Sequence, residues 1–242
     1  MIQKPARGRQ RLSALARMLL DTPELREAYD ALLAGLRLNV TFNSGKSILV
    51  TSTQPSEGKS TVASCLAVTA SLAGQTVLLI DGDLRRPWLV AAVGIPDGIG
   101  FGEILDGQTD AAEAVHLVGL FDETRDACQL NVMGAGRKAP TFLAGVDWPR
   151  ARTAFRALSR QFGIVFLDSP PILAANDALL LAGIVDGILL VVGADANTDE
   201  VRRAKQQLDP IGTPVIGAVL NQFDPKLHGR SNQPYRGYYL NS

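Results

Sequence analysis

The chain has 242 residues, of which 46% are hydrophobic and 20% are charged, values typical of an ordinary globular protein. Its 24 basic and 24 acidic side chains give a formal net charge of zero. This balance gives no global electrostatic case for binding nucleic acid, so we expect no nucleic-acid partner.

The cysteines and the apolar segments bear on where the protein works. Cys65 and Cys128 lie far apart without CxxC spacing, which favours buried thiols in a reducing compartment over a metal site or a disulfide. Arginines interrupt the first segment, so no signal peptide is visible. The most apolar stretch, 172–192, contains two aspartates and an asparagine, which favours a buried helix and strand over a membrane span. We expect a cytoplasmic protein.

Basic residues crowd the start of the chain, with no acidic side chain before Asp21. We interpret residues 1–22 as a basic, solvated N-terminal arm outside the folded domain. The functional alternative is attraction to an anionic membrane surface or an acidic partner. The sequence Asp21-Thr22-Pro23-Glu24 then predicts a helix start, and apolar residues at helical spacing continue to Leu36.

Residues 23–225 alternate apolar strands with helices, and we expect them to form one domain. The expected strands cover residues 48–52, 76–81, 163–171, 187–192 and 214–221, and the expected helices 59–73, 151–162, 176–183 and 198–208. Residues 94–145 are harder to interpret, and we expect loops, short helices and a weak strand at 130–136 there. The alternation predicts a doubly wound, mostly parallel α/β sheet with helices on both faces. Ligands of such sheets bind beyond the carboxyl ends of the strands.

Directly after the first strand of this domain, the sequence reads TQPSEGKST (53–61). A phosphate-binding loop needs this position, because the backbone N–H groups and the start of the next helix then face the phosphates. The match to G-x-x-x-x-G-K-[ST] is imperfect, since Thr53 occupies the first glycine position. We predict that Lys59 reaches the β and γ oxygens and that Ser60 offers a hydroxyl to Mg²⁺. The remaining loop candidates for nucleotide binding are Gln54, Pro55, Ser56, Glu57, Gly58 and Thr61.

Two further strands end in acidic residues. LLIDGDLRRP (78–87) carries Asp81 and Asp83 at its carboxyl end, where strand alternation would point both carboxylates to the same side. VFLDSPP (165–171) ends its strand in Asp168, the Walker B arrangement, in which a carboxylate holds Mg²⁺ through its water shell. A helix cap or a turn aspartate is the ordinary alternative for the first pair. Together with the GKS loop, however, the three acids predict a metal–nucleotide site.

These motifs resemble one known family. In this order, TSTQPSEGKST, LLIDGDLRRP, DSPP, DGILLVV and VLN are similar to the cytoplasmic domain of the bacterial tyrosine kinases (BY-kinases) of capsule and exopolysaccharide synthesis. That family lies within the MinD/ParA-like P-loop ATPases. The resemblance spans residues 46–224, and in this family a serine or threonine often stands where Thr53 does. It implies a P-loop NTPase fold, ATP and Mg²⁺ as cofactors, and protein-tyrosine autokinase activity.

The resemblance also implies roles for the acidic residues and the loop. Lys59 and Ser60 would bind the phosphates and Mg²⁺, and Asp83 and Asp168 would hold metal-bound waters. Asp81 would take or orient the proton of the tyrosine hydroxyl. Cations and metal-holding carboxylates are the groups that phosphoryl transfer requires, since it depends on positioning and charge neutralisation.

Three further positions take roles from the resemblance. Arg85 and Arg86 would contribute charge near the transferring phosphoryl group or the incoming tail. Asn221 would contact adenine at the end of the last strand.

The last segment, 226–242, has little helix or strand signal, and we expect a flexible tail. It holds three of the four tyrosines, Tyr235, Tyr238 and Tyr239. Composition alone favours a disordered tail without a role, whereas the resemblance implies that these tyrosines are phosphoacceptors, modified in trans. Fully extended at about 3.3 Å per residue, the tail would reach roughly 55 Å, enough to enter a neighbouring subunit.

The resemblance implies partners as well. They are a separate membrane adaptor that regulates polysaccharide chain length, further copies of the chain in a homo-oligomer, and a phosphotyrosine phosphatase. The adaptor would hold the protein at the inner face of the cell membrane. Asp30 and Leu33 stand where arginines of the family's ring-assembly segment, ExxRxxR, would follow Glu27. Assembly in the family's manner is therefore not supported.

Two other functions are open to this sequence. The main alternative is a MinD/ParA-like switch that binds ATP, dimerises and recruits a membrane partner without phosphorylating tyrosine. The early lysine of that group's KGGxGK loop is missing, because the stretch here reads Thr53-Gln54-Pro55. An iron–sulfur cluster carrier of the same group would need a CxxC pair, which the sequence lacks.

Overall fold

The structure is a computed structural model of the chain that describes residues 9–39, 46–107, 111–120, 129–138 and 140–224. The expected tail with its three tyrosines lies outside the described residues, as does Cys128.

In the described part of the chain, seven strands form one sheet in the order β3-β4-β2-β5-β1-β6-β7. The strands are β1 (Lys46–Ser52), β2 (Val77–Asp81), β3 (His116–Gly119), β4 (Gln129–Met133), β5 (Ile164–Asp168), β6 (Gly187–Gly193) and β7 (Val215–Asn221). Neighbouring strands run parallel, except that the edge strand β3 is antiparallel to β4. The mostly parallel sheet is thus confirmed.

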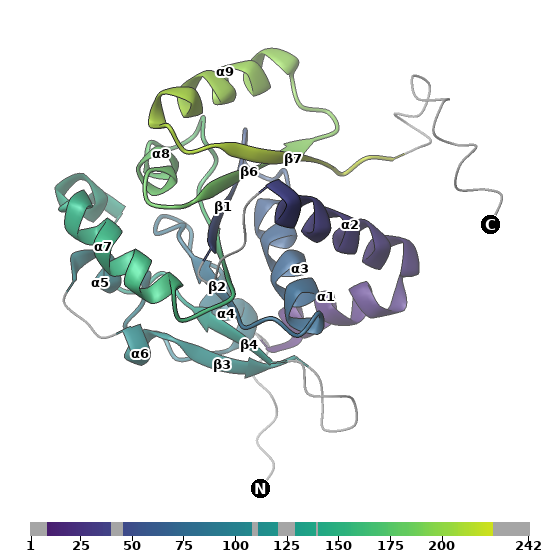
Figure 1. Cartoon of the computed structure of the whole chain (residues 1–242), viewed down its shortest axis with the longest axis horizontal. Coiled ribbons are helices and arrows are strands. Elements are labelled where there is room, and N and C mark those ends of the chain that lie inside the picture. The colour runs from purple at the N-terminus through teal and green to yellow at the C-terminus, as the bar shows by residue number, and fades with distance from the viewer. Residues whose placement is uncertain (1–8, 40–45, 108–110, 121–128, 139, 225–242) are drawn as a thin grey trace, which may run out of the picture.

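Helices cover both faces of this sheet (Figure 1). One face carries α1 (Arg9–Asp21), α2 (Pro23–Asn39), α3 (Lys59–Leu72) and α4 (Leu89–Val93). The other carries α5 (Phe101–Asp106), α7 (Trp148–Ser159), α8 (Asp177–Ala182) and α9 (Thr198–Leu208). The short helices α6 (Ala111–Ala114), η1 (Pro140–Gly145) and η2 (Asp209–Ile211) complete the described elements.

The central strands consist mostly of apolar residues because each of their faces is buried. In β1, Ile48 and Val50 pack into the core cluster beneath α1–α3, while Leu49 packs into the cluster beneath α7 and α8. All three side chains have no exposed surface. Two hydrophobic layers therefore hold the sheet rigidly, and its carboxyl edge provides a fixed base for the site.

The N-terminal segment differs from our expectation. Residues 9–21, which we assigned to a solvated arm, form α1, and Leu12, Ala16 and Leu19 are at most 1% exposed in the core. The expectation of a solvated arm is wrong for these residues. Their spacing places them on one face of an amphipathic helix, while Arg17 lies on the exposed surface. The prediction of an arm gave more weight to the arginines of this segment than to the spacing of its apolar residues.

The bounds of the other helices and strands differ less from those that we expected. The helix expected at 151–162 begins earlier, at Trp148, because the Asp147 side chain accepts a hydrogen bond from the N–H of Arg150 and caps it. The weak strand at 130–136 corresponds to β4, but its antiparallel neighbour β3 was not predicted. Among the described residues, no helix is both long and apolar enough to span a bilayer.

Burial of the first cysteine is confirmed. Cys65 lies in α3 with no exposed surface, and burial raises the pKa of its thiol to about 11. Such a thiol is a packing group rather than a reactive one.

Candidate nucleotide and phosphoryl-transfer site

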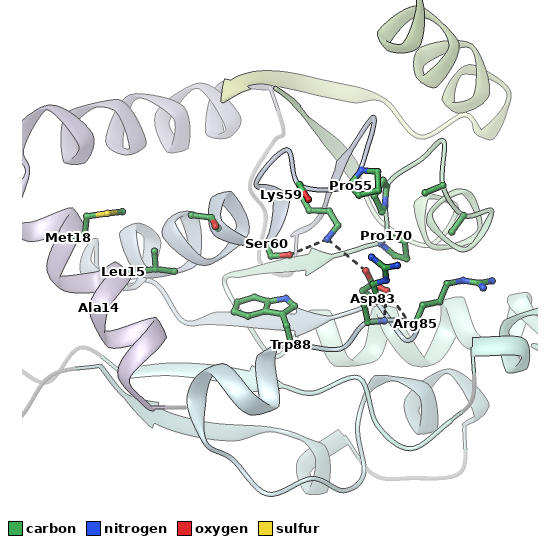
Figure 2. A pocket seen from close by; sticks show the side chains of 16 residues that line it. Ala14, Leu15, Met18, Pro55, Lys59, Ser60, Asp83, Arg85, Trp88 and Pro170 are labelled. Atoms are coloured by element: carbon green, nitrogen blue, oxygen red, sulfur yellow. Dashed lines mark hydrogen bonds and ion pairs between the residues drawn. The ribbon is translucent and has the colours of Figure 1, made fainter. Parts of the chain in front are cut away.

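A pocket of about 650 Å³ lies at the carboxyl ends of β1, β2 and β5, and the expected site residues that line it include Lys59, Ser60, Asp83, Arg85 and Arg86. Its walls are formed by the loop before α3, by the segment 83–88 after β2, by residues 170–175 after β5, and by α1. Figure 2 shows Lys59, Ser60, Asp83 and Trp88 converging on this space. The helix that we expected to be an arm thus forms one wall of the site.

The loop at 53–60 has the backbone of a phosphate-binding loop. Ser56 and Gly58 both have positive φ angles, 68° and 88°, and α3 begins directly afterwards at Lys59. A β-carbon at Gly58 would lie 2.1 Å from the side-chain nitrogen of Asn221. The left-handed backbone and this close approach both require glycine here. The N-terminus of α3 is consequently open to an anion.

Glu57 closes the loop from within. Its carboxylate accepts hydrogen bonds from the N–H of Thr53 (2.8 Å), the hydroxyl of Thr53 (2.6 Å) and the N–H of Gln54 (2.9 Å), and Glu57 is only 7% exposed. Thr53, at the position of the missing first glycine, is therefore one end of an internal clamp. This arrangement makes Glu57 a support of the loop.

The end of β7 braces the loop from outside. The side-chain N–H of Asn221 donates to the carbonyl oxygen of Glu57 at 2.8 Å, and that of Gln222 donates to the carbonyl oxygen of Ser56 at 2.9 Å. Gln54 donates to Glu200 of α9 at 3.0 Å. Asn221 thus lies beside the loop, and its contact with adenine stays a prediction.

Lys59 lies between two carboxylates. Its Nζ is 3.8 Å from Asp83 Oδ2 and 3.9 Å from Asp168 Oδ1, and it donates to the hydroxyl of Ser60 at 3.2 Å. Figure 2 shows this lysine extended from the loop toward the segment after β2. The cation, the hydroxyl and the two acids predicted from sequence are therefore brought together.

Asp81 and Asp83 have different surroundings, although they are two residues apart. Asp83 lines the pocket, whereas Asp81 does not and has no exposed surface. Asp81 accepts hydrogen bonds from the N–H groups of Asp83, Trp88 and Leu89. Since β2 ends at Asp81, strand alternation does not extend to Asp83, and the expectation that both carboxylates face one way is not confirmed.

Burial dominates the acid–base behaviour of the innermost carboxylates. It raises the pKa of Asp81 to about 7, against the lowering effect of the three backbone N–H donors. It also raises the pKa of Asp168, while the neighbouring Lys59 lowers it. A carboxylate with a pKa near neutral suits general base catalysis.

The two oxygens of Asp168 differ in their contacts. The indole N–H of Trp88 donates to Oδ2 at 2.7 Å, while Oδ1 is buried and accepts no hydrogen bond from any described residue. A buried carboxylate oxygen left in this way is typical of a place that water or an ion fills.

The two arginines have separate surroundings. Arg85 binds Asp177 of α8 through both Nε and Nη2, at 2.5 and 3.1 Å. Arg86 is exposed and lines the same pocket. In this arrangement Arg85 faces α8, and Arg86 is available to a charged ligand.

The donor set suits Mg²⁺ together with phosphates. No cluster of three or more His, Cys, Asp or Glu that could hold a metal occurs among the described residues. Mg²⁺ is usually bound by one or two carboxylates together with substrate phosphates and water. Ser60, Asp83 and Oδ1 of Asp168 form a set of that kind beside the phosphate-binding loop.

Sequence reasoning missed Trp88 and Asp177. The signal for Trp88 was its position directly after DLRRP, because a tryptophan in a site segment needs a partner for its N–H. Asp177 follows DSPP by several residues, and nothing local links it with Arg85.

The sheet order, the strand–GKS loop–helix junction and the aspartate at the end of β5 define a P-loop NTPase. No protein-family model matches the chain. The tyrosine-protein kinase YwqD of Bacillus subtilis is 32% identical over 209 residues, 84% of each chain. The tyrosine-protein kinase CpsD of Streptococcus pneumoniae is 32% identical over 200 residues, 82% of this chain and 84% of that protein.

Solved structures agree. The kinase domain of the Escherichia coli tyrosine kinase ETK matches with a TM-score of 0.71 and 28% identity, over 81% of this chain and 74% of that one. The chain belongs to the bacterial tyrosine-protein kinases. The predicted fold class, family and enzyme class are thereby confirmed.

Proposed function

We propose that the chain is an ATP- and Mg²⁺-dependent autokinase that phosphorylates Tyr235, Tyr238 and Tyr239 in trans. Through this modification it would regulate the polymerisation and export of a capsular or extracellular polysaccharide. The observation that carries the proposal is the position of Lys59 Nζ at the phosphate-binding loop, within 4 Å of both Asp83 and Asp168. This geometry brings together a cation suited to bind phosphate and two carboxylates suited to hold Mg²⁺.

The chain's own groups divide the work of phosphoryl transfer. Lys59 and the backbone N–H groups of residues 56–61 would bind the phosphates, and the hydroxyl of Ser60 with Asp83 and Asp168 would hold Mg²⁺. Bound there, Mg²⁺ would neutralise charge on the phosphate oxygens. Because the side chains of Lys59, Asp83 and Asp168 are at most 15% exposed, these fixed charges act more strongly than they would in water.

Asp81 is our proposed acceptor for the proton of the tyrosine hydroxyl. Its raised pKa, about 7, supports this role, since a general base works best when its pKa lies near the operating pH. A base must also come within hydrogen-bond reach of the acceptor oxygen. Asp81 does not line the pocket and has no exposed surface, so this role requires the pocket wall to open to the tyrosine.

Arg86 is proposed to attract the phosphates or the incoming tail, as an exposed cation at the pocket. Arg85 would share this role only after leaving Asp177. Asn221 would contact adenine beside the loop that it braces.

The proposal includes a membrane adaptor that holds the protein at the inner face of the cell membrane, a homo-oligomer, and an opposing phosphotyrosine phosphatase. In α2, Glu27 and Asp30 are exposed, whereas Leu33 is 3% exposed in the core. That helix face therefore cannot present an ExxRxxR pattern, and we propose that the oligomer forms through other contacts.

The test is phosphopeptide mass spectrometry after incubation with Mg-ATP, with and without the cytoplasmic peptide of the candidate adaptor. We expect phosphotyrosine on the tail, and none in a variant with all three tail tyrosines changed to Phe. Mixing that variant with a Lys59→Ala protein should phosphorylate the Lys59→Ala tail, which demonstrates transfer in trans. ATP hydrolysis without tail phosphotyrosine in either condition would instead support the MinD/ParA-like switch.

A further inference from the structure

Trp88 bridges two buried carboxylates that belong to adjacent strands. Asp81 and Asp168 are register partners at the ends of β2 and β5, and neither has exposed surface. The main-chain N–H of Trp88 donates to Asp81 Oδ2 at 2.7 Å, and its indole N–H donates to Asp168 Oδ2, also at 2.7 Å. One residue therefore ties both acids to the segment after β2.

This bridge fixes the orientation of the Asp168 carboxylate. The carboxylate torsion is broad, so an untied Asp168 could rotate its carboxylate plane and turn its oxygens away from Lys59. The indole N–H holds Oδ2, and Oδ1 remains without a hydrogen-bond partner among the described residues, 3.9 Å from Lys59 Nζ. The carboxylate thus has a fixed orientation.

Core packing alone does not explain a tryptophan at this position. Leu89, the next residue, is 1% exposed and belongs to the core cluster, whereas Trp88 is only partly buried at its border and lines the pocket. Figure 2 shows its ring between α1 and the segment that carries Asp83.

We propose that Trp88 is a positioning residue, whose indole N–H orients Asp168 so that Oδ1 alone faces the metal-bound waters. The inference rests on the Mg²⁺–nucleotide site proposed above. Hydrogen-bond donors behind a metal-holding carboxylate commonly set its orientation, and their loss lowers metal affinity about 10- to 100-fold.

The test compares Trp88→Phe, which keeps a ring but removes the N–H, with Trp148→Phe as a matched control at the start of α7. Calorimetry would measure ADP binding in EDTA and across a Mg²⁺ titration. We expect the Trp148→Phe control to bind ADP as the wild type does, in EDTA and with Mg²⁺. The Mg²⁺ concentration at half-saturation should rise about tenfold or more in Trp88→Phe alone.

The outcomes separate the two proposals. An unchanged Mg²⁺ requirement in Trp88→Phe, or an equal loss of ADP affinity with and without Mg²⁺, would overturn the positioning role. If ADP binding by the wild type did not depend on Mg²⁺, the result would count against the proposed metal site itself.

A second measurement does not depend on the folding of Trp88→Phe. In the Trp148→Phe protein, Trp88 is the remaining tryptophan of the two in the chain, so ¹⁵N labelling gives one indole cross-peak. We expect its N–H to be protected from solvent exchange and to stay protected after Mg²⁺ and ADP are added. Loss of protection on that addition would overturn the proposal, because the ring would then leave Asp168 when the site fills.

Discussion

The two walls of the site are built in different ways. The phosphate-binding loop is held from within by a neighbour in sequence, since Glu57 binds backbone and side-chain groups three and four positions away, while Asn221 and Gln222 brace it from outside. The acidic wall is held by distant partners: Trp88 and Asp168 are 80 positions apart, and Arg85 and Asp177 are 92 apart. The internal clamp of the loop can therefore form from local contacts, whereas the hydrogen bond of Trp88 to Asp168 and the ion pair of Arg85 require the completed sheet.

The walls also differ in charge. The loop directs N–H groups and the start of α3 toward the pocket, whereas the opposite wall carries Asp83, with the buried Asp81 and Asp168 behind it. Lys59 is the point where they meet. Substitutions of Lys59, of a residue within one wall, or of Arg85 at the exposed edge of the acidic wall should therefore have effects of different size.

The largest effect should follow from Lys59→Ala, which removes the contact between the walls. Losing one fixed charge that stabilises a transition state costs roughly 100- to 1,000-fold in rate. We expect tail phosphorylation, followed by quantitative phosphopeptide analysis, to fall by that factor. Lys205→Ala, which changes an exposed lysine of α9, is the control. A decrease of less than about tenfold in Lys59→Ala would contradict the assigned role.

Asp81→Asn tests whether Asp81 makes the stability of the protein depend on pH. The folded protein holds the proton of Asp81 more tightly than the unfolded chain does, because burial raises its pKa from 3.8 to about 7. The contribution of this group to stability is complete below about pH 4 and is lost as pH rises toward 7. The loss is at most about 1.4 kcal/mol per pH unit.

Because asparagine does not ionise, the Tm of Asp81→Asn relative to the wild type should rise between pH 4.5 and 7.5. Thermal unfolding at several pH values measures this difference. A constant difference across the range would show that Asp81 is not the group responsible.

Glu57→Ala breaks the loop from within. It leaves the N–H groups of Thr53 and Gln54 without their acceptor, which should cost about 1–3 kcal/mol of unfolding free energy and weaken ADP binding. Glu200→Ala is the matched control, since Glu200 contacts Gln54 from outside. Urea unfolding and calorimetry would measure both. Equal effects of the two substitutions would show that the loop does not depend on its internal clamp.

The same contrast explains what the sequence could predict. The loop, the strand ends and the doubly wound sheet follow from local patterns, so Lys59, Ser60 and Asp168 were found where the structure places them. The spacing of Leu12, Ala16 and Leu19 could have predicted the buried face of α1, but the arginines of this segment favoured a solvated arm. The partners of Trp88 and Arg85 could not be predicted, because they exist only once β2, β5 and α8 are side by side. Glu57 was assigned to the nucleotide because sequence spacing does not reveal which way a loop side chain turns.

Arg85→Ala should have the smallest effect on stability. It tests whether a contact between residues far apart in the sequence stabilises the protein even where the contact is exposed. Its ion pair with Asp177 spans 92 positions, yet the arginine side chain is 51% exposed, and exposed pairs contribute about 0–1 kcal/mol. We expect a change in unfolding free energy below about 1 kcal/mol, smaller than that of Glu57→Ala. If chemical denaturation gave a loss as large as that of Glu57→Ala, distant contacts would stabilise the acidic wall even at its exposed rim. A small loss of unfolding free energy would show that exposure limits what this ion pair contributes to stability. If tail phosphorylation were also slower, the result would support a role of Arg85 toward the phosphoryl group.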